Sequence, residues 1–205
     1  VTSIRSYFGH KRHDAVDEDL LRGWLFAVPA GALLASAAAA YMSSGMLRAV
    51  FAVVCILIAL KLLLGKDSWR LGKELPGNPL KALVGTAIGF LSTLMGIGGG
   101  VLNNTFMTAY GRPIHQAVAT SAGIGMLIAI PGFLGYIWAG WGQAGLPPFS
   151  TGYVNWLAVA LLIPMSIIVT PYGVKTAHAL PKRRLELLLG AYLVFVAARF
   201  GWSLL

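Results

Sequence analysis

Charged residues are scarce in this chain of 205 residues. Only 11% of them are charged, whereas 57% are hydrophobic. A soluble domain carries about 25% charged residues, and one of this size cannot hide so much apolar surface in its core. Lipid must therefore be the solvent for much of the chain. The composition predicts an integral membrane protein and excludes an ordinary soluble domain.

Residues that commonly build reactive sites are also few. The single cysteine, Cys55, lies in an apolar run, which excludes an intrachain disulfide and argues against a thiolate metal site. No Asp or Glu falls in the middle of a predicted membrane span, which argues against a carboxylate proton relay or a cation site. The histidines lack ligand spacing with carboxylates; they are His10, His13, His115 and His178. We therefore expect no enzyme, no metal and no cofactor.

The basic residues that are present follow the connections between apolar runs. Sixteen Lys and Arg against seven Asp and Glu give a net charge of +9. Basic residues in short loops are typical of the cytoplasmic side of a membrane protein, which faces anionic lipid. The expected partner of this charge is the lipid bilayer, and we expect no nucleic acid.

Long uncharged runs predict the helices. A span of the hydrocarbon core, about 30 Å thick, needs about 20 residues. In the first run Pro29 is expected to kink the helix, and residues 140–152 are expected to turn the chain. Residues 1–8 resemble the end of an earlier helix. The predicted segments are 21–42, 46–64, 81–95, 101–109, 114–139, 153–174 and 182–205.

One uncharged run, from Ala82 to Gly111, is too long for a single straight span. As one helix it would measure about 45 Å. The sequence Gly96-Ile97-Gly98-Gly99-Gly100 interrupts it, because each glycine in a helix interior costs about 1 kcal/mol relative to alanine. Two short arms remain. The broken segment either crosses the membrane or enters and returns to the same side.

The positive charges distinguish these two layouts. A re-entrant segment, with the C-terminus outside, leaves only Arg48 and Arg199 on the outer side. The opposite side then holds nearly all other Lys and Arg residues, which is a strong positive-inside bias. If the segment crosses, residues 66–81 and 175–184 fall on opposite sides and the bias largely disappears. We therefore predict a re-entrant segment.

A weak internal repeat supports the same layout. Residues 47–61 match residues 185–199, and a basic residue ends each run. The repeat unit then crosses the membrane three times, so the second copy is inverted, a recognised transporter plan. We predict a single transmembrane domain over 1–205, with the remainder of repeat one at 1–64 and repeat two at 80–205. The fold class is all-α, a polytopic transmembrane helical bundle with inverted repeats and a glycine-broken re-entrant helix.

The glycine break is the predicted binding site for a small anion. Glycines expose backbone N–H groups, and the helix that begins near Val101 adds a positive dipole end. Amide and hydroxyl donors follow at once, and two more hydroxyls lie on the next helix. A glycine-rich packing contact, with hydroxyls bonded back to their own helix, remains an alternative. The predicted substrate-binding residues are Gly98, Gly99, Gly100, Asn103, Asn104, Thr105, Thr120 and Ser121.

These motifs resemble those of a known family. The run from Gly85 to Gly100, followed by Pro113 and the segment Ala117-Val118-Ala119-Thr120-Ser121, is similar to the sulfite exporter TauE/SafE family. The chain departs from that pattern at residues 103–105, where members often carry an apolar run with a proline. On this resemblance roughly the first quarter of a full-length protein, with its own glycine motif, would precede Val1.

The resemblance implies a function. It indicates a multi-pass secondary transporter of the bacterial inner membrane, an exporter of small anions such as sulfite or organosulfonates. An anion channel of the same architecture and a non-transporting membrane scaffold are the alternatives. Assembly into a homo-oligomer is left open.

Overall fold

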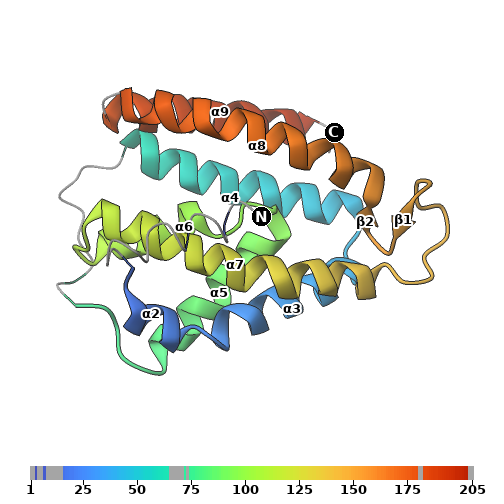
Figure 1. The fold of residues 1–205 in the computed structure, drawn as a ribbon, viewed down its shortest axis with the longest axis horizontal. Helices are drawn as coiled ribbons and strands as arrows, with labels where there is room; N and C mark the ends of the chain where they lie inside the picture. Colours follow the sequence, from blue (N-terminus) through green and yellow to red (C-terminus); the bar gives the residue numbers. More distant parts are fainter. Residues whose placement is uncertain are drawn as a thin grey trace. The chain divides into compact units, whose positions relative to one another are not determined.

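A computed structural model describes residues 3, 7, 16–64, 72, 74–179 and 182–202. Helices dominate these residues, as the composition predicted (Figure 1). The expected helix end in residues 1–8 lies largely outside them. The helices are α2 (Glu18–Gly23), α3 (Ala27–Tyr41), α4 (Ser44–Leu64), α5 (Leu80–Met95), α6 (Gly100–Ala109), α7 (Ile114–Ala139), α8 (Trp156–Ala179) and α9 (Lys182–Trp202).

The chain forms two compact units, each built from two stretches of sequence. The first unit comprises Val1–Tyr41 and Arg70–Leu157, and the second comprises Met42–Trp69 and Ala158–Leu205. The first contains the glycine break and the helices around it. The predicted repeat boundaries are a separate matter of sequence likeness and stay a prediction.

Two helices of the described residues have the length and composition of membrane spans. Among the described residues, α4 and α7 are long and apolar enough to cross a bilayer. Shorter apolar helices accompany them over Ala27–Tyr41, Leu80–Met95, Trp156–Val169 and Leu187–Trp202. Large apolar side chains such as Leu161, Leu162 and Ile168 of α8 are exposed, as expected where lipid is the solvent. The all-α membrane fold that the sequence predicted is confirmed.

The helix predicted over 21–42 is two helices, and the chain turns at residues 24–26, between α2 and α3. The bonds from Val28 N to the Trp24 carbonyl and from Ala30 N to the Phe26 carbonyl lie on either side of the missing bond from Pro29 to Leu25. The interruption therefore lies in the turn before Pro29, where a proline is expected to kink a helix. Trp24 is fully buried, and its indole Nε1–H donates to the Lys81 carbonyl at 2.6 Å. This contact joins the turn to the start of the next arm, at Lys81.

Small residues let α3 approach two other helices closely. A Cβ at Gly31 would collide with the backbone of Thr86, and one at Gly89 would collide with the carbonyl of Val28. Ser36 of α3 lies against Gly135 of α7 in the same way. Such small-residue contacts hold membrane helices together where burial from water cannot. A core cluster fills the space between these helices: Leu20, Trp24, Val28, Ile88, Met107, Ala117, Ile124 and Ile128.

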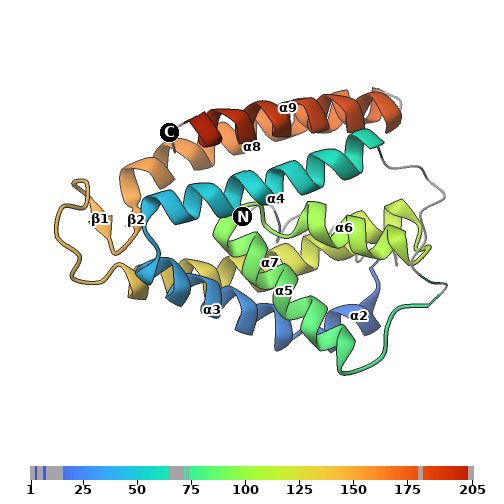
Figure 2. The same cartoon turned by 180° about the vertical axis from the view of Figure 1, so that it is seen from behind.

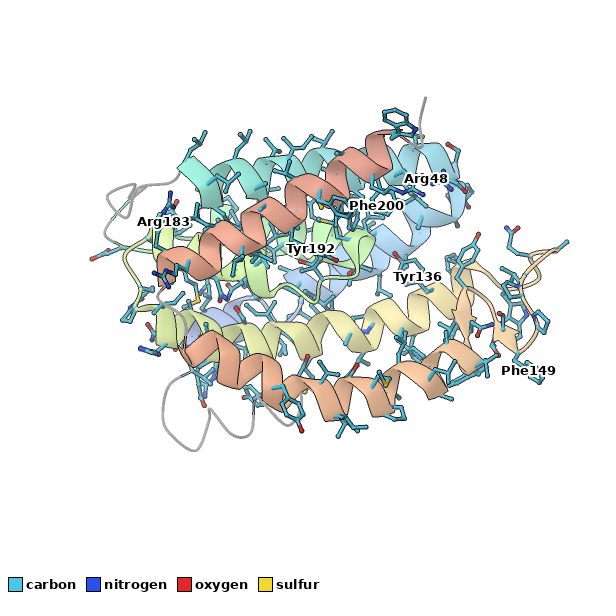
Figure 3. The ribbon with its side chains drawn as sticks, turned by 90° about the horizontal axis from the view of Figure 1, so that it is seen from above. Arg48, Tyr136, Phe149, Arg183, Tyr192 and Phe200 are labelled. Carbon is cyan, nitrogen blue, oxygen red and sulfur yellow. The ribbon has the colours of Figure 1, made fainter. Side chains whose placement is uncertain are left out.

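In the second unit, α4 and α9 pack antiparallel. The rings of Phe51 and Phe200 lie 5.0 Å apart between centroids, at the start of α4 and the end of α9. At the opposite ends, the Arg183 guanidinium donates to the carbonyls of Leu62 and Leu63, at 3.0 and 2.7 Å. Figure 3 labels Arg183 and Phe200 toward the two ends of α9. These contacts fix the register of the pair.

The link predicted as a plain turn over 140–152 carries a small hairpin. Strands β1 (Ser150–Thr151) and β2 (Val154–Asn155) pair antiparallel, with Ser150 opposite Asn155. Gly152 packs against the backbone of Ile137, so the hairpin is held against the end of α7. Each strand has only two residues, which is too short for an alternation of apolar and polar side chains to predict it.

Candidate binding site at the glycine break

The broken segment forms a hairpin of two helical arms. Helix α5 leads to a tip at residues 96–99, and α6 returns toward the end where α5 began (Figure 2). Trp24 touches both outer ends: its indole bonds to Lys81 at the start of α5, and its ring lies 5.5 Å from that of Phe106 in α6. The segment therefore has the hairpin form that a re-entrant layout requires, while its return to the same side of the membrane stays a prediction.

Glycines give the tip its shape. Gly96, Gly98 and Gly99 have φ values of 65°, 68° and 78°, in the left-handed region that favours glycine. Gly96 ends α5, and the N–H groups of Gly96 and Ile97 bond to the carbonyls of Thr93 and Ser92. This is the Schellman pattern of a helix C-terminus. The sequence thus encodes the break through residues that can adopt these angles without strain.

The first turn of α6 supplies backbone donors beside the tip. The first helical hydrogen bond runs from Asn103 N to Gly99 O at 2.9 Å, so the N–H groups of residues 100–102 precede it. Gly99 is buried against α7, and a Cβ there would lie 2.6 Å from Cδ1 of Ile128. Free N–H groups and the positive helix end together favour a negative ligand.

Asn103 lies at the centre of a polar cluster between α6 and α7. Its side chain is fully buried. One proton of its amide Nδ2 goes to Ser121 Oγ at 2.7 Å, and the other is shared between the carbonyl of Ala117 and the sulfur of Met107, each at 3.4 Å. A buried amide in an apolar segment is costly unless it is bonded, so these contacts hold α6 against α7.

Ser121 links both asparagines. Its hydroxyl accepts from Asn103 and donates to Asn104 Oδ1 at 2.7 Å, with a longer contact of 3.5 Å to the Gly100 carbonyl. The fold therefore brings together five of the predicted residues: Gly99, Gly100, Asn103, Asn104 and Ser121. Their role in binding stays a prediction, but their proximity is a structural fact.

Two further hydroxyls, which the sequence did not single out as site residues, lie at the end of α5 beside the glycine break. Within the described chain, Ser92 Oγ and Thr93 Oγ1 are buried without a hydrogen-bond partner. Ser92 Oγ lies 3.6 Å from where a Cβ of Gly99 would be, and Thr93 Oγ1 lies near Gly132. Other helical hydroxyls, such as that of Thr86, bond back to their own helix. Ser92 and Thr93 do not.

Thr120 and Thr105 are placed differently from the other predicted residues. Thr120 Oγ1 accepts from the backbone N–H of Asp17 at 2.9 Å, which ties the start of α2 to α7. Thr105 follows Asn103 by two positions, about 200° around α6, so it faces away from the contact with α7. Gly98 approaches Gly125 through its carbonyl, which lies 3.1 Å from a Cβ built there.

A polar cavity of about 610 Å³ lies at the outer ends of the two arms. Its lining holds Asp17, Asp19, Glu74, Lys81 and Arg112. Asp17 Oδ2 lies 3.7 Å from Arg112 Nε, and the Lys81 ammonium donates to the carbonyl of Asp19 at 3.0 Å. Charges of both signs gather here, whereas the cluster at the tip is built from neutral donors.

The fold and the cluster together define a class: an all-α membrane protein with a glycine-broken helical hairpin. The chain belongs to the sulfite exporter TauE/SafE family, whose model matches residues 1–200. No solved structure gives a significant match to it.

Two relatives are similar over part of the chain. A probable membrane transporter protein of Haemophilus influenzae is 34% identical over 150 residues, which cover 72% of this chain and 56% of the relative. A probable membrane transporter protein of Methanocaldococcus jannaschii is 32% identical over 112 residues, which cover 54% of this chain and 40% of the relative. The chain thus spans about half the length of these relatives.

Proposed function

We propose that this protein is a secondary transporter of small anions, and that the anion binds at the tip of the α5–α6 hairpin. One observation carries the proposal: buried, neutral hydrogen-bonding groups surround a left-handed glycine break at the start of a helix. Ser92, Asn103 and Ser121 are buried polar residues in an otherwise apolar part of the protein. Polar groups at membrane depth are expensive and mark substrate paths.

The proposed chemistry needs no charged side chain. Backbone N–H groups of residues 100–102 and the α6 dipole attract the anion, and the Ser92 hydroxyl lies close enough to the same turn to add a donor. Half-helices whose N-termini point at anionic groups are a feature of transporters with inverted repeats. Irregular backbone at this depth is tolerable because protein surrounds it.

The substrate, the direction of transport and the location in this proposal are taken from the family to which the chain belongs. Sulfite and organosulfonates are the proposed substrates, export is the proposed direction, and the bacterial inner membrane is the proposed location of a multi-pass chain. The two probable transporter proteins of other organisms support transport as the general activity. Lipid and a small anionic substrate are the proposed partners.

Reconstitution of the purified protein into liposomes tests this proposal. We expect sulfite flux that saturates and that either follows a gradient or exchanges one anion for another. The flux should saturate because a carrier must bind its substrate before transport. Gly99→Leu should abolish the flux, since a side chain there meets Ile128 and requires an unfavourable φ. Gly201→Leu is the matched control, because within the described chain nothing lies within 4 Å of a Cβ there.

Two results would contradict the proposal. Ohmic current without saturation would favour an anion channel of the same architecture. If no anion crosses and Gly99→Leu behaves like Gly201→Leu in cells, the protein is not a transporter, and a scaffold role takes its place. Thermal melting of both variants separates loss of transport from loss of folding.

A further inference from the structure

Two basic residues line the polar cavity at the outer ends of the hairpin arms. Lys81 lies in the first turn of α5, and Arg112 lies just beyond the end of α6. Gly111, at φ 76°, ends the turn after α6, and the backbone N–H of Arg112 bonds to the Met107 carbonyl at 3.0 Å. The local backbone therefore places Arg112 at the cavity.

The Arg112 guanidinium is available to a ligand. Its Nε lies 3.7 Å from Asp17 Oδ2, which is too long for a hydrogen bond, and the side chain is 43% exposed. Within the described residues the guanidinium forms no hydrogen bond. Its N–H groups form a fixed fork that matches two oxygens of an oxyanion. Arg112 can thus bind an oxyanion without losing an existing hydrogen bond.

The Asp17 carboxylate is itself an oxyanion held beside Arg112. It is 9% exposed, and its Oδ1 accepts from the backbone N–H of Leu20 at 3.0 Å, which caps α2. The backbone N–H of Asp17 donates to Thr120 Oγ1 at 2.9 Å. Neither bond involves Arg112, so Asp17 stays in place when another anion contacts the guanidinium. Its negative charge then repels that anion.

The remaining charges of the cavity act less directly on Arg112. Lys81 donates to the backbone carbonyl of Asp19 at 3.0 Å, which leaves the charge of the ammonium unpaired by this contact. The carboxylates of Asp19 and Glu74 belong to exposed residues, where water and salt screen them. Asp17 is therefore the carboxylate that most directly opposes an anion at Arg112.

We infer that Lys81 and Arg112 form an entry site for small oxyanions, and that Asp17 competes with the oxyanion for Arg112. The inference rests on the proposed function, because the entry site gives the transported anion a contact before the hairpin tip. The two sites lie at opposite ends of α6, whose ten residues span about 15 Å. Competition from Asp17 keeps binding weak, which a site that passes an ion onward requires.

Protection of an introduced cysteine tests the entry site. Gly77 lines the cavity, and within the described chain nothing lies within 4 Å of a Cβ there. Gly77→Cys in a Cys55→Ala background therefore places a thiol beside the site. Methanesulfonate, a small oxyanion, should slow the labelling of this thiol by a maleimide, relative to sodium chloride at equal ionic strength. Gln143→Cys, exposed in the link after α7, should label at an unchanged rate.

Two charge variants should shift this protection in opposite directions. Asp17→Asn keeps the helix cap and removes the charge, so it should lower the half-protecting concentration about two- to fivefold, the effect of one partly exposed charge. Arg112→Gln should raise that concentration by at least a similar factor. Arg22→Gln is the matched control, because Arg22 is 77% exposed, pairs with Glu18 and lies outside the cavity lining. It should change nothing.

Folding of each variant is checked by thermal melting. If Arg112→Gln does not fold, the shift in Asp17→Asn still decides, because a loss of structure would not tighten anion binding. Shifts of Asp17→Asn and Arg112→Gln in the same direction would overturn the inference, since the pair would then act only on structure. Equal protection of the cysteines at positions 77 and 143, or protection of neither, would overturn it as well.

Sulfite flux into liposomes tests the proposed transport separately. Flux without protection at position 77 would remove the entry site and leave transport intact. Protection without flux of any anion would contradict transport and leave an anion-binding cavity.

Discussion

At the scale of single residues, the glycines of the break do two different things. Gly98 has φ 68° and open space around a Cβ, so its contribution is conformational. Gly99 has φ 78° and also lies against Ile128 and Ile124 of α7. Glycine at both positions avoids the strain that a side chain would create. At Gly99, unlike Gly98, a side chain would also collide with α7.

Replacing Gly99 should therefore destabilise the protein. We expect Gly99→Ala to lower the free energy of unfolding by about 1–3 kcal/mol, the cost of a non-glycine residue held at positive φ. Gly201→Ala lies in α9 at ordinary φ and should change stability by less than about 1 kcal/mol. Chemical unfolding in detergent measures both, and equal losses would show that the break carries no strain.

Removing the hydroxyl of Thr93, in contrast, should not destabilise the protein. In the described chain this hydroxyl is buried without a partner, so Thr93→Val should leave stability unchanged or raise it by up to about 1 kcal/mol. Thr86→Val is the matched change on the same helix, where the lost hydroxyl bonds to the Ala82 carbonyl at 3.0 Å. It should cost up to about 1 kcal/mol. A loss at Thr93 as large as at Thr86 would reveal a tightly bound partner.

At the scale of elements, Trp24 holds the two arms of the hairpin at their outer ends. Its indole bonds to Lys81 of α5 and its ring packs on Phe106 of α6. Pro29 is the local sign of an interruption there, because a proline removes the hydrogen bond to the carbonyl four residues before it. The sequence alone did not show that Trp24 would be buried with its indole bonded to the Lys81 carbonyl, since that contact joins residues far apart in the chain.

Trp24→Phe separates the hydrogen bond from the ring contact. It should lower the free energy of unfolding by about 0.5–1.5 kcal/mol, the usual net value of one hydrogen bond. Trp138→Phe is a suitable control, because Trp138 of α7 is 68% exposed and should tolerate the change. Equilibrium unfolding of the two variants measures the difference. Equal effects would mean that the indole bond does not hold the hairpin.

The α4–α9 pair contains the two runs of the predicted inverted repeat, residues 47–61 and residues 185–199. The two helices pack antiparallel, with Phe51 against Phe200 near one end and Arg183 bonded to the carbonyls of Leu62 and Leu63 at the other. The repeat itself stays a prediction.

At the scale of the whole molecule, the sequence predicted most helices because long apolar runs have few alternatives in a membrane. The break was predictable because it depends on the backbone angles that the glycines themselves can adopt, and not on distant contacts. The sequence did not identify Ser92 and Thr93, since a helical hydroxyl usually bonds to its own helix and its rotamer depends on neighbours. The partner of Thr120, the backbone of Asp17, was equally hidden, because 103 residues separate the two.

The topology can be tested with single cysteines in a Cys55→Ala background. Asn78 and His115 flank the broken segment and are exposed. A re-entrant segment predicts that cysteines at these two positions label from the same side of the membrane, with Lys66, and that one at Ser150 labels from the other. Labelling of positions 78 and 115 from opposite sides would show that the segment crosses.

The central claim is that a small anion binds at the glycine break, and its most direct test is the effect of sulfite on unfolding. Sulfite at about 100 times its dissociation constant should stabilise the purified protein by about 2.7 kcal/mol. Gly201→Leu should retain this stabilisation, and Gly99→Leu should lose it. Stabilisation of all three proteins alike would place the anion elsewhere, and no stabilisation of the unmodified protein would contradict the sulfite site.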